Sequence, residues 1–278
     1  MQRIARIDRD RWIGYSRARD GFEGLERLLR AERRQRPDNL LIVGASNNGK
    51  TAIARRFIAR MLPPENPAAR SSNIPVTLIQ APNGPRISQL LTAIRAALGQ
   101  PSGRRETTAQ LRIEVYRMIR AVGLRLLLMD DLHNIRGAGG APLLVELREL
   151  GSAAGISLGC FATREIAYAL RQDDQLANRF DLMTLPRWQI DDPDYWRLLH
   201  TYARRLPLRS ASNLADPKLA AHILVRSDGL IGAVTRLLRQ AAVQAVRSGH
   251  ERIDREMLDQ VRTTTPAAIE GLAASELL

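Results

Sequence analysis

The sequence has very little cysteine and no long apolar run. The single Cys160 excludes an internal disulfide, and no spaced Cys and His partners accompany it as a zinc site would require. It lies in the apolar stretch ISLGCF and is predicted to be a small core residue. No stretch reaches the ~18 apolar residues that span a membrane, and the first residues, MQRIARIDRDRW, lack the apolar segment of a secretory signal. We therefore expect a soluble, cytoplasmic protein with no membrane partner.

Histidine and lysine are also scarce. The four histidines are isolated, no Ser/His/Asp or Cys/His constellation is present, and a structural role is favoured for His133. Only Lys50 and Lys218 are lysines among 42 Lys and Arg residues. The net charge of +13 favours a polyanionic partner such as nucleic acid, although arginine richness can equally reflect genomic base composition. Retention of lysine at position 50 suggests that a guanidinium does not fit there.

What the chain does contain is an alternation of strand and helix patterns. Its 278 residues, 45% of them hydrophobic, suffice for one large domain or a domain with a smaller appendage. Short apolar runs predict buried strands at 40–43, 75–81, 124–131 and 156–163. Three-to-four periodicity predicts helices at 51–62, 87–99, 106–123 and 142–155. This order predicts an α/β fold, a parallel sheet with helices on both faces.

The pattern changes near residue 186. Residues 1–36 carry Phe22, Leu25 and Leu28 at helical spacing and predict a helix ending at Pro37. We expect this N-terminal segment to pack near the site described next, followed by an α/β core over 37–186. Only amphipathic helix patterns occur over 187–265, which predicts a small helical domain, and 266–278 is a tail.

One glycine-rich segment fits the phosphate-binding loop G-x-x-x-x-G-K-[ST] and lies between a predicted strand and helix. In such a loop, backbone N–H groups and the helix N-terminus surround a phosphate, and a lysine reaches the β and γ oxygens as a compact charge. The threonine hydroxyl binds Mg²⁺. The alternative is an ordinary turn. The candidate residues are Gly44, Ala45, Ser46, Asn47, Asn48, Gly49, Lys50 and Thr51.

The strand LRLLLMDD ends in two acids, Asp130 and Asp131. After a phosphate loop this is the Walker B pattern, in which Asp130 would hold Mg²⁺ and Asp131 would orient the attacking water. Asp131 is one methylene shorter than the usual glutamate, which favours slow hydrolysis. The alternative is that the two acids merely cap a loop.

Five segments together resemble a known family. They are RWIGY (11–15), RPDNLLIVGASNNGKTAIARRF (36–57), LLLMDDLHN (126–134), FATREIAYALRQDDQLANRFD (161–181) and SDGLIGAVTRLLRQAA (227–242). They resemble the AAA+ ATPases and, within them, the TniB family of transposition proteins, which is similar to TnsC and more distantly to MuB. The resemblance implies a P-loop AAA+ fold with an all-helical lid, and ATP with Mg²⁺ as cofactors.

The resemblance also implies roles for single residues. Trp12, Ile13 and Tyr15 would lie by the adenine, unless they form a hydrophobic staple onto the core. Thr163, at the end of a strand, would be the polar sensor of the γ-phosphate. Arg179 would be an arginine finger acting in the neighbouring subunit, with a surface charge as the alternative. Arg236 is the candidate second sensor.

The family assembles around duplex DNA, which places the segment between the second and third strands against the duplex. Arg86, Arg104, Arg105 and Thr107 would then bind phosphates without reading bases, or they belong to a solvated loop. The implied function is an ATPase that forms a ring or helical filament on target DNA and stimulates a TniA-like transposase. A TniQ-like adaptor is a further implied partner. The alternatives are a helicase loader or replication initiator, and a nucleotide-gated DNA scaffold with little turnover.

Overall fold

The computed structural model describes residues 2–8, 12–62, 73–82, 84, 86–100, 106–132, 140–171 and 178–262. The chain divides into two compact units. We call Arg17–Ser46 with Lys50–Leu185 the sheet unit, and Met1–Ser16 with Asn47–Gly49 and Pro186–Leu278 the helical unit. The domain limits predicted from the sequence stay a prediction.

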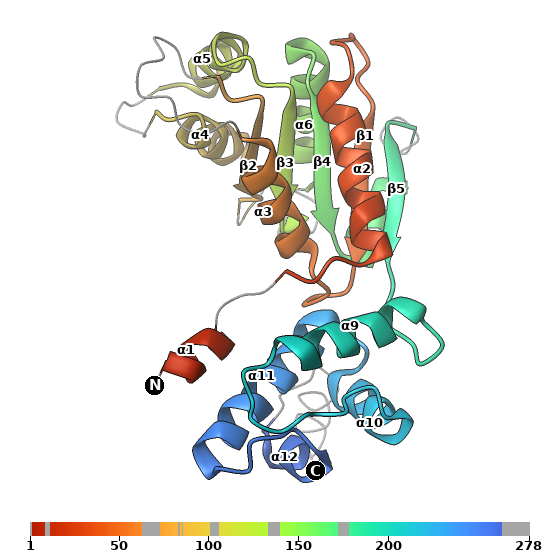
Figure 1. Cartoon of the computed structure of the whole chain (residues 1–278). Coiled ribbons are helices and arrows are strands. Elements are labelled where there is room, and N and C mark those ends of the chain that lie inside the picture. Colours follow the sequence, from red (N-terminus) through yellow and green to blue (C-terminus); the bar gives the residue numbers. More distant parts are fainter. Residues whose placement is uncertain are drawn as a thin grey trace, which may run out of the picture. The chain divides into compact units, whose positions relative to one another are not determined.

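The sheet unit contains five strands in the order β2-β3-β4-β1-β5, and each neighbouring pair is parallel (Figure 1). The strands are β1 (Asn39–Gly44), β2 (Val76–Gln80), β3 (Leu126–Asp130), β4 (Ser157–Ala162) and β5 (Phe180–Leu185). The predicted parallel sheet is therefore confirmed. All strands end at one edge, called here the carboxyl edge, and begin at the opposite, amino edge.

One strand was not predicted. The edge strand β5 pairs only with β1 in the sheet, and most of its residues are exposed or half-buried. Its sequence FDLMTL mixes polar and apolar residues, because a half-exposed edge strand does not need the continuous apolar run of a strand covered on both faces.

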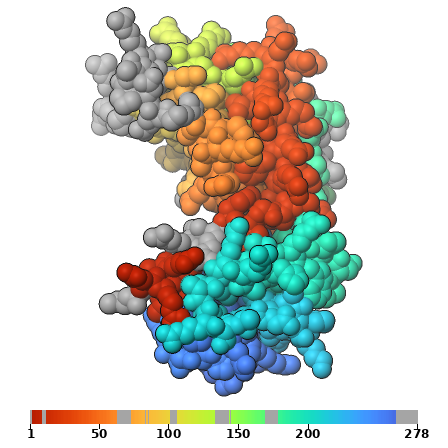
Figure 2. Space-filling view, in the orientation of Figure 1, coloured from red at the N-terminus to blue at the C-terminus, as the bar shows by residue number. Residues whose placement is uncertain are grey.

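Helices cover both faces of the sheet. Alternate residues of β1 point to opposite faces: Leu41 and Val43 join the core formed with the helices α4 (Ile87–Ala97), α5 (Thr108–Ala121) and α6 (Gly140–Ala154). Helices α2 (Ser16–Arg30) and α3 (Lys50–Met61) share the other face, where Phe22 and Phe57 meet edge to face at 5.7 Å. In Figure 2 their side chains hide the central strands. The helix α7 (Arg164–Arg171) follows β4.

The N-terminal helix prediction needs correction. Helix α2 ends at Arg30, well before Pro37, and a separate helix, α1 (Gln2–Asp8), precedes it. The apolar positions that α2 buries stop at Leu28, and the following ERRQR has none. Gly24 lets α2 approach the sheet closely, because a Cβ there would lie 2.9 Å from Leu40 Cδ2.

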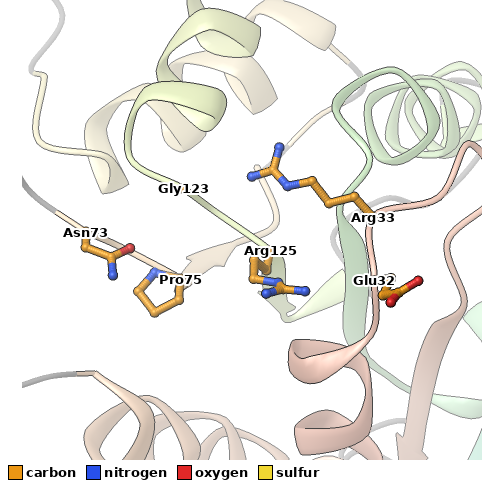
Figure 3. Close-up of a pocket in the computed structure, with 6 residues that line it drawn as sticks. All are labelled: Glu32, Arg33, Asn73, Pro75, Gly123 and Arg125. Atoms are coloured by element: carbon orange, nitrogen blue, oxygen red, sulfur yellow. The ribbon is translucent and has the colours of Figure 1, made fainter.

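A pocket of the sheet unit lies at the amino edge (Figure 3), where β2 and β3 begin. Its lining includes Arg33, Arg125, Asn73 and Gly123. Both guanidiniums already bind the main chain: Arg33 donates to Leu124 O at 3.0 Å and Arg125 to Ala31 O at 2.6 Å. These arginines therefore tie the segment after α2 to the start of β3.

The helical unit is built from short amphipathic helices. They are α1, α9 (Pro193–Arg205), α10 (Pro217–Ser227), α11 (Ile231–Ser248) and α12 (Arg255–Gln260). Asp192, Asp216 and Asp254 are the N-caps of α9, α10 and α12, and each accepts a bond from a backbone N–H of its helix. The core includes Tyr195, whose hydroxyl donates to Ala220 O at 2.8 Å.

Helix α1 is anchored in this unit by an ion pair. Arg3 donates to both carboxylate oxygens of Glu251, at 2.8 and 2.7 Å. The contact lowers the pKa of Glu251 to about 2, since the paired arginine stabilises the ionised carboxylate. None of the described helices combines the length and the apolar composition needed to cross a lipid bilayer.

Candidate functional site

The glycine-rich segment connects the end of β1 to the start of α3, as the phosphate-loop pattern predicts. Gly44 is the last residue of β1 and Lys50 the first of α3. The Lys50 side chain is only 6% exposed, and its ammonium donates to Gly44 O at 2.9 Å and Ala45 O at 2.8 Å. Burial lowers the pKa of Lys50, while the charges of Asp130, Asp131 and Glu165 oppose that shift. A compact buried cation is thus held at the carboxyl edge.

The middle of the loop has the curled backbone that anion binding requires. Asn47 and Gly49 have positive φ angles of 60° and 82°. Left-handed residues of this kind let successive N–H groups face one concave side. Asn48 between them is 2% exposed. Thr51 in the first turn of α3 is half-buried.

The two acids lie at the carboxyl end of β3, at the same edge. Asp130 is the last residue of β3 and 1% exposed, and its Oδ1 accepts from the N–H of Asp131 at 2.9 Å. Asp131 has a φ of 54°, a left-handed conformation that aspartate tolerates better than most residues. Asp130 therefore belongs to the strand, whereas Asp131 belongs to the turn that follows it.

Thr163 directly follows β4, and its Oγ1 is buried without a hydrogen-bond partner among the described residues. A buried hydroxyl without a partner costs free energy, so the Thr163 hydroxyl is suited to donate to a bound ligand or to a water.

The sheet order brings these groups together. Strand β4 lies between β3 and β1, so Asp130, Thr163 and Gly44 follow three adjacent parallel strands at one edge. Neighbouring strands are about 4.8 Å apart, which sets the spacing of these positions at roughly 5–10 Å. A cation, an acid pair and an unpaired hydroxyl are thus brought to the carboxyl edge of the sheet unit.

The residues fit a magnesium ion shared with a ligand rather than one held by protein alone. Among the described residues, no group of three or more His, Cys, Asp or Glu side chains is placed to hold a metal. Mg²⁺ is typically bound through one or two carboxylates together with substrate phosphates and water. Asp130 with Thr51 supplies such a partial set.

Arg179 lies away from this cluster, at the amino edge. It precedes β5, and its main-chain O accepts from Nδ2 of Asn39, the first residue of β1, at 3.0 Å. Its guanidinium donates to Ser152 Oγ at 3.3 Å. Because β1 runs from Asn39 to Gly44, at about 3.3 Å per residue Arg179 lies on the order of 15 Å from the loop of its own chain.

The residues proposed to lie near the adenine belong to the helical unit. Tyr15 is 9% exposed and stacks edge to face on Trp188 at 5.1 Å, and a Cβ on Gly49 would lie 3.6 Å from its hydroxyl. Trp12 and Ile13 are half-buried, and Trp12 O accepts from Arg205 at 3.3 Å. Arg236 is exposed on α11. Of these residues, Tyr15 lies against the loop within the helical unit.

The candidate DNA contacts are only partly described. Arg86 is exposed at the N-cap position of α4. Thr107 is the N-cap of α5, where it forms a reciprocal capping box with Gln110 that already explains its presence. Arg104 and Arg105 lie outside the described residues, as does His133.

Sequence reasoning missed three features of the described residues. Glu165, in the first turn of α7, acts on Lys50 through its charge. Asn39 is buried and bonds both Arg179 and the N–H of Leu158. Gly232 donates its N–H to Asn47 O at 3.0 Å. Only Glu165 left a signal in the sequence, because its carboxylate comes two residues after the predicted sensor Thr163. The roles of Asn39 and Gly232 depend on tertiary contacts.

Comparison with known proteins agrees with this geometry. The sequence model of a family described as bacterial TniB protein matches residues 3–190. The chain is 26% identical over 267 residues to ORC1-type DNA replication protein 1 of Aeropyrum pernix, covering 91% of this chain and 64% of that protein. It therefore spans less than two thirds of that relative.

Two structures are similar over nearly the whole chain. The Aeropyrum pernix ORC1 protein in complex with DNA has a TM-score of 0.67 at 20% identity, over 98% of this chain and 69% of that one. The Aeropyrum pernix ORC2 protein in ADPNP-ADP complexes has a TM-score of 0.62 at 18% identity, over 92% and 70%. At such identity the likeness establishes the fold, and it confirms the AAA+ architecture predicted from the sequence.

Proposed function

Because this chain belongs to the TniB family and has the AAA+ fold, we propose that it is an ATP-dependent regulator of DNA transposition that assembles on target duplex DNA. The observation that carries the proposal is the family match over residues 3–190 together with the phosphate loop, Asp130 and Thr163 at one sheet edge. Family membership supports ATP as the nucleotide, and the transposition role follows from the family's name.

The residues of the carboxyl edge have separate proposed roles in binding and hydrolysing the nucleotide. The loop from Gly44 to Gly49 surrounds the phosphates with backbone N–H groups, and Lys50 binds the β and γ oxygens. Thr51 and Asp130 would hold Mg²⁺, which neutralises phosphate charge when bound. Asp131 orients the attacking water and accepts its proton. Thr163 directs its hydroxyl to the γ-phosphate or that water.

The remaining proposed roles concern the base and the neighbouring subunit. Trp12, Ile13 and Tyr15 contact the adenine, and Arg236 is the second sensor. Arg179 completes the site of the neighbouring protomer, where its charge stabilises the departing γ-phosphoryl group. Its position at the opposite edge from its own loop supports action between subunits. Hydrolysis therefore requires a homo-oligomer, a ring or a helical filament.

We further propose that the oligomer binds duplex DNA with little sequence preference through Arg86, Arg104, Arg105 and Thr107. It then recruits and stimulates a TniA-like transposase, with a TniQ-like adaptor as a further partner, and ATP hydrolysis resets the assembly. The net charge of +13 supports a polyanionic partner. The proposed domains are the N-terminal segment 1–36, the ATPase core 37–186, the helical lid 187–265 and the tail 266–278.

Binding to a labelled random duplex tests the proposal directly. Fluorescence anisotropy with and without a non-hydrolysable ATP analogue and Mg²⁺ should show nucleotide-dependent binding. Its affinity should fall with salt at a slope of about −0.9 per phosphate contacted. Electron micrographs of the same mixture should show rings or filaments on the DNA. Protein that binds no adenine nucleotide, or a salt-independent DNA affinity, contradicts the proposal.

A second candidate function is a replication role, favoured by the similarity to an ORC1-type DNA replication protein. A strand-transfer assay with a TniA-like transposase distinguishes the transposition role from the replication role. Nucleotide-dependent stimulation supports transposition, whereas loading of a replicative helicase without such stimulation supports replication. A steady-state ATPase assay with DNA addresses the scaffold alternative: nucleotide-dependent assembly without turnover would favour a nucleotide-gated scaffold.

A further inference from the structure

The first turn of α11 is capped by the phosphate loop. The initial N–H groups of a helix have no partner inside the helix, and the N-cap residue of α11, Leu230, offers no side-chain bond. The N–H of Gly232 donates to Asn47 O at 3.0 Å. The N–H of Ile231 makes a longer contact with Asn48 Oδ1, at 3.5 Å. All these residues belong to the helical unit, so the loop supplies the cap that α11 lacks locally.

Gly232 is required by this close approach. A Cβ at position 232 would lie 2.1 Å from Asn47 Oδ1 and 2.6 Å from Asn47 O. Both distances are far below van der Waals contact, and one of the two atoms is main chain, which cannot rotate away. Glycine weakens a helix relative to alanine. Its presence in the first turn of α11 is therefore explained by the contact with the loop and not by the helix itself.

The loop residues Asn47, Asn48 and Gly49 make further contacts within the helical unit. Asn48 Nδ2 donates to Pro186 O at 3.1 Å, and a Cβ on Gly49 would lie 3.1 Å from Ile231 Cγ2. Asn47 and Gly49 keep left-handed φ angles of 60° and 82°. Tyr15, which lies against Gly49, stacks on Trp188. Contacts with the rest of the helical unit thus hold the backbone of Asn47–Gly49 in this conformation.

We propose that Gly232, Asn47 and Asn48 are positioning residues, through which the first turn of α11 holds the phosphate loop in its nucleotide-binding shape. The proposal rests on the proposed nucleotide-binding function and deepens it. The coupling runs through the main chain and needs no charged side chain from α11, so it is distinct from the role proposed for Arg236. Binding couplings are reciprocal, so a nucleotide that stabilises the loop also stabilises the first turn of α11.

The decisive variant is Gly232→Ala, with Gly249→Ala as its matched control. Gly249 is the C-cap of the same helix and has a φ of 77°, so alanine there strains the fold, but nothing lies within 4 Å of the new Cβ. By calorimetry with Mg²⁺, Gly232→Ala should bind a non-hydrolysable ATP analogue at least tenfold more weakly than wild type. Gly249→Ala should stay within about threefold.

A rescue experiment separates positioning from a general loss of packing. Asn47→Gly keeps the main-chain carbonyl and the left-handed backbone but removes Oδ1, the atom nearest the added Cβ. The affinity of Asn47→Gly alone is measured as the reference for the double variant. In the double variant it should recover part of the affinity that Gly232→Ala loses, because one of the two clashes is gone. No recovery in a folded double variant contradicts the proposed contact.

Hydrogen exchange gives a readout that a purely structural role would not move. In wild type, adding the nucleotide analogue should slow exchange at the amides of residues 231–235, and in Gly232→Ala this protection should be lost. If wild type binds no nucleotide, the proposed function fails. If wild type binds and Gly232→Ala binds equally well, only the coupling fails. Should Gly232→Ala not fold, the wild-type exchange decides: protection supports the coupling and its absence overturns it.

Discussion

The two edges of the sheet carry different kinds of side chain. At the carboxyl edge, Gly44, Asp130 and Thr163 lie at the ends of three adjacent strands, and Lys50 donates to Gly44 O. At the amino edge, Arg179 stands apart from that cluster, and Arg33 and Arg125 bind main-chain carbonyls. In a parallel sheet the two edges are separated by the full length of the strands. The first edge can therefore act on a ligand of its own chain, and the distance of Arg179 from that edge agrees with the role we propose for it in the site of another protomer.

The largest effect should come from removing Arg179, the residue that we propose acts between subunits. Arg179→Ala should lower DNA-stimulated ATP turnover about 1000-fold while leaving nucleotide affinity unchanged, because an arginine finger acts on the departing phosphoryl group and not on binding. Turnover by phosphate release and affinity by calorimetry measure the two separately. Arg36→Ala is the matched control, since Arg36 is exposed and lines, together with Arg179, a second pocket at the amino edge, where β1 and β5 begin.

A Lys50 variant, alone and mixed with the Arg179 variant, tests whether the two residues act across a subunit boundary. Lys50→Ala should weaken nucleotide binding about 100-fold, because the loop loses its charged hydrogen-bond donor. Lys218→Ala, which changes the only other lysine, should have no effect. When Lys50→Ala and Arg179→Ala subunits are mixed, some protomers regain both an intact loop and a neighbouring Arg179, so turnover should exceed that of either variant alone. Turnover that stays at the sum of the two would mean that Lys50 and Arg179 of the same chain act together, which contradicts action between subunits.

Thr163→Val should have a smaller, purely functional effect. Its hydroxyl has no partner among the described residues, so replacing it with a methyl group should not lower the free energy of unfolding. Loss of one hydrogen-bond donor to the reacting groups should reduce turnover about tenfold or more. Chemical denaturation together with steady-state kinetics tests both parts. A destabilised variant with normal turnover would assign Thr163 to the fold instead.

The smallest functional effect is expected at Asn39, the residue that fixes the main chain at Arg179. Asn39→Ala removes two hydrogen bonds from a side chain 6% exposed, and should lower the free energy of unfolding by about 1–3 kcal/mol. Turnover should fall only a few-fold, through displacement of Arg179. Asn39→Asp keeps the acceptor for Leu158 but turns a second acceptor toward Arg179 O and buries a charge, so it should lower the free energy of unfolding at least as much. An Asn39→Asp variant as stable as wild type would contradict this assignment of the two bonds.

The sequence predicts the carboxyl edge far better than the amino edge. Four strands are continuous apolar runs, and the loop and acids follow them at fixed spacing, so periodicity and motif suffice. Strand β5 escapes prediction because Asp181 and Thr184 interrupt its apolar pattern at a half-exposed edge. The place of Arg179 depends on that strand. The contact of Gly232 with Asn47 joins residues far apart in the chain and leaves no local pattern.

The ion pair between Arg3 and Glu251 also bears on how the protein is made. The two residues are 248 positions apart in the chain. At a translation rate of roughly 5–20 residues per second, about 12–50 s pass between their synthesis. Helix α1 therefore leaves the ribosome long before its docking partner exists, and during that interval it is available to chaperones or to proteases.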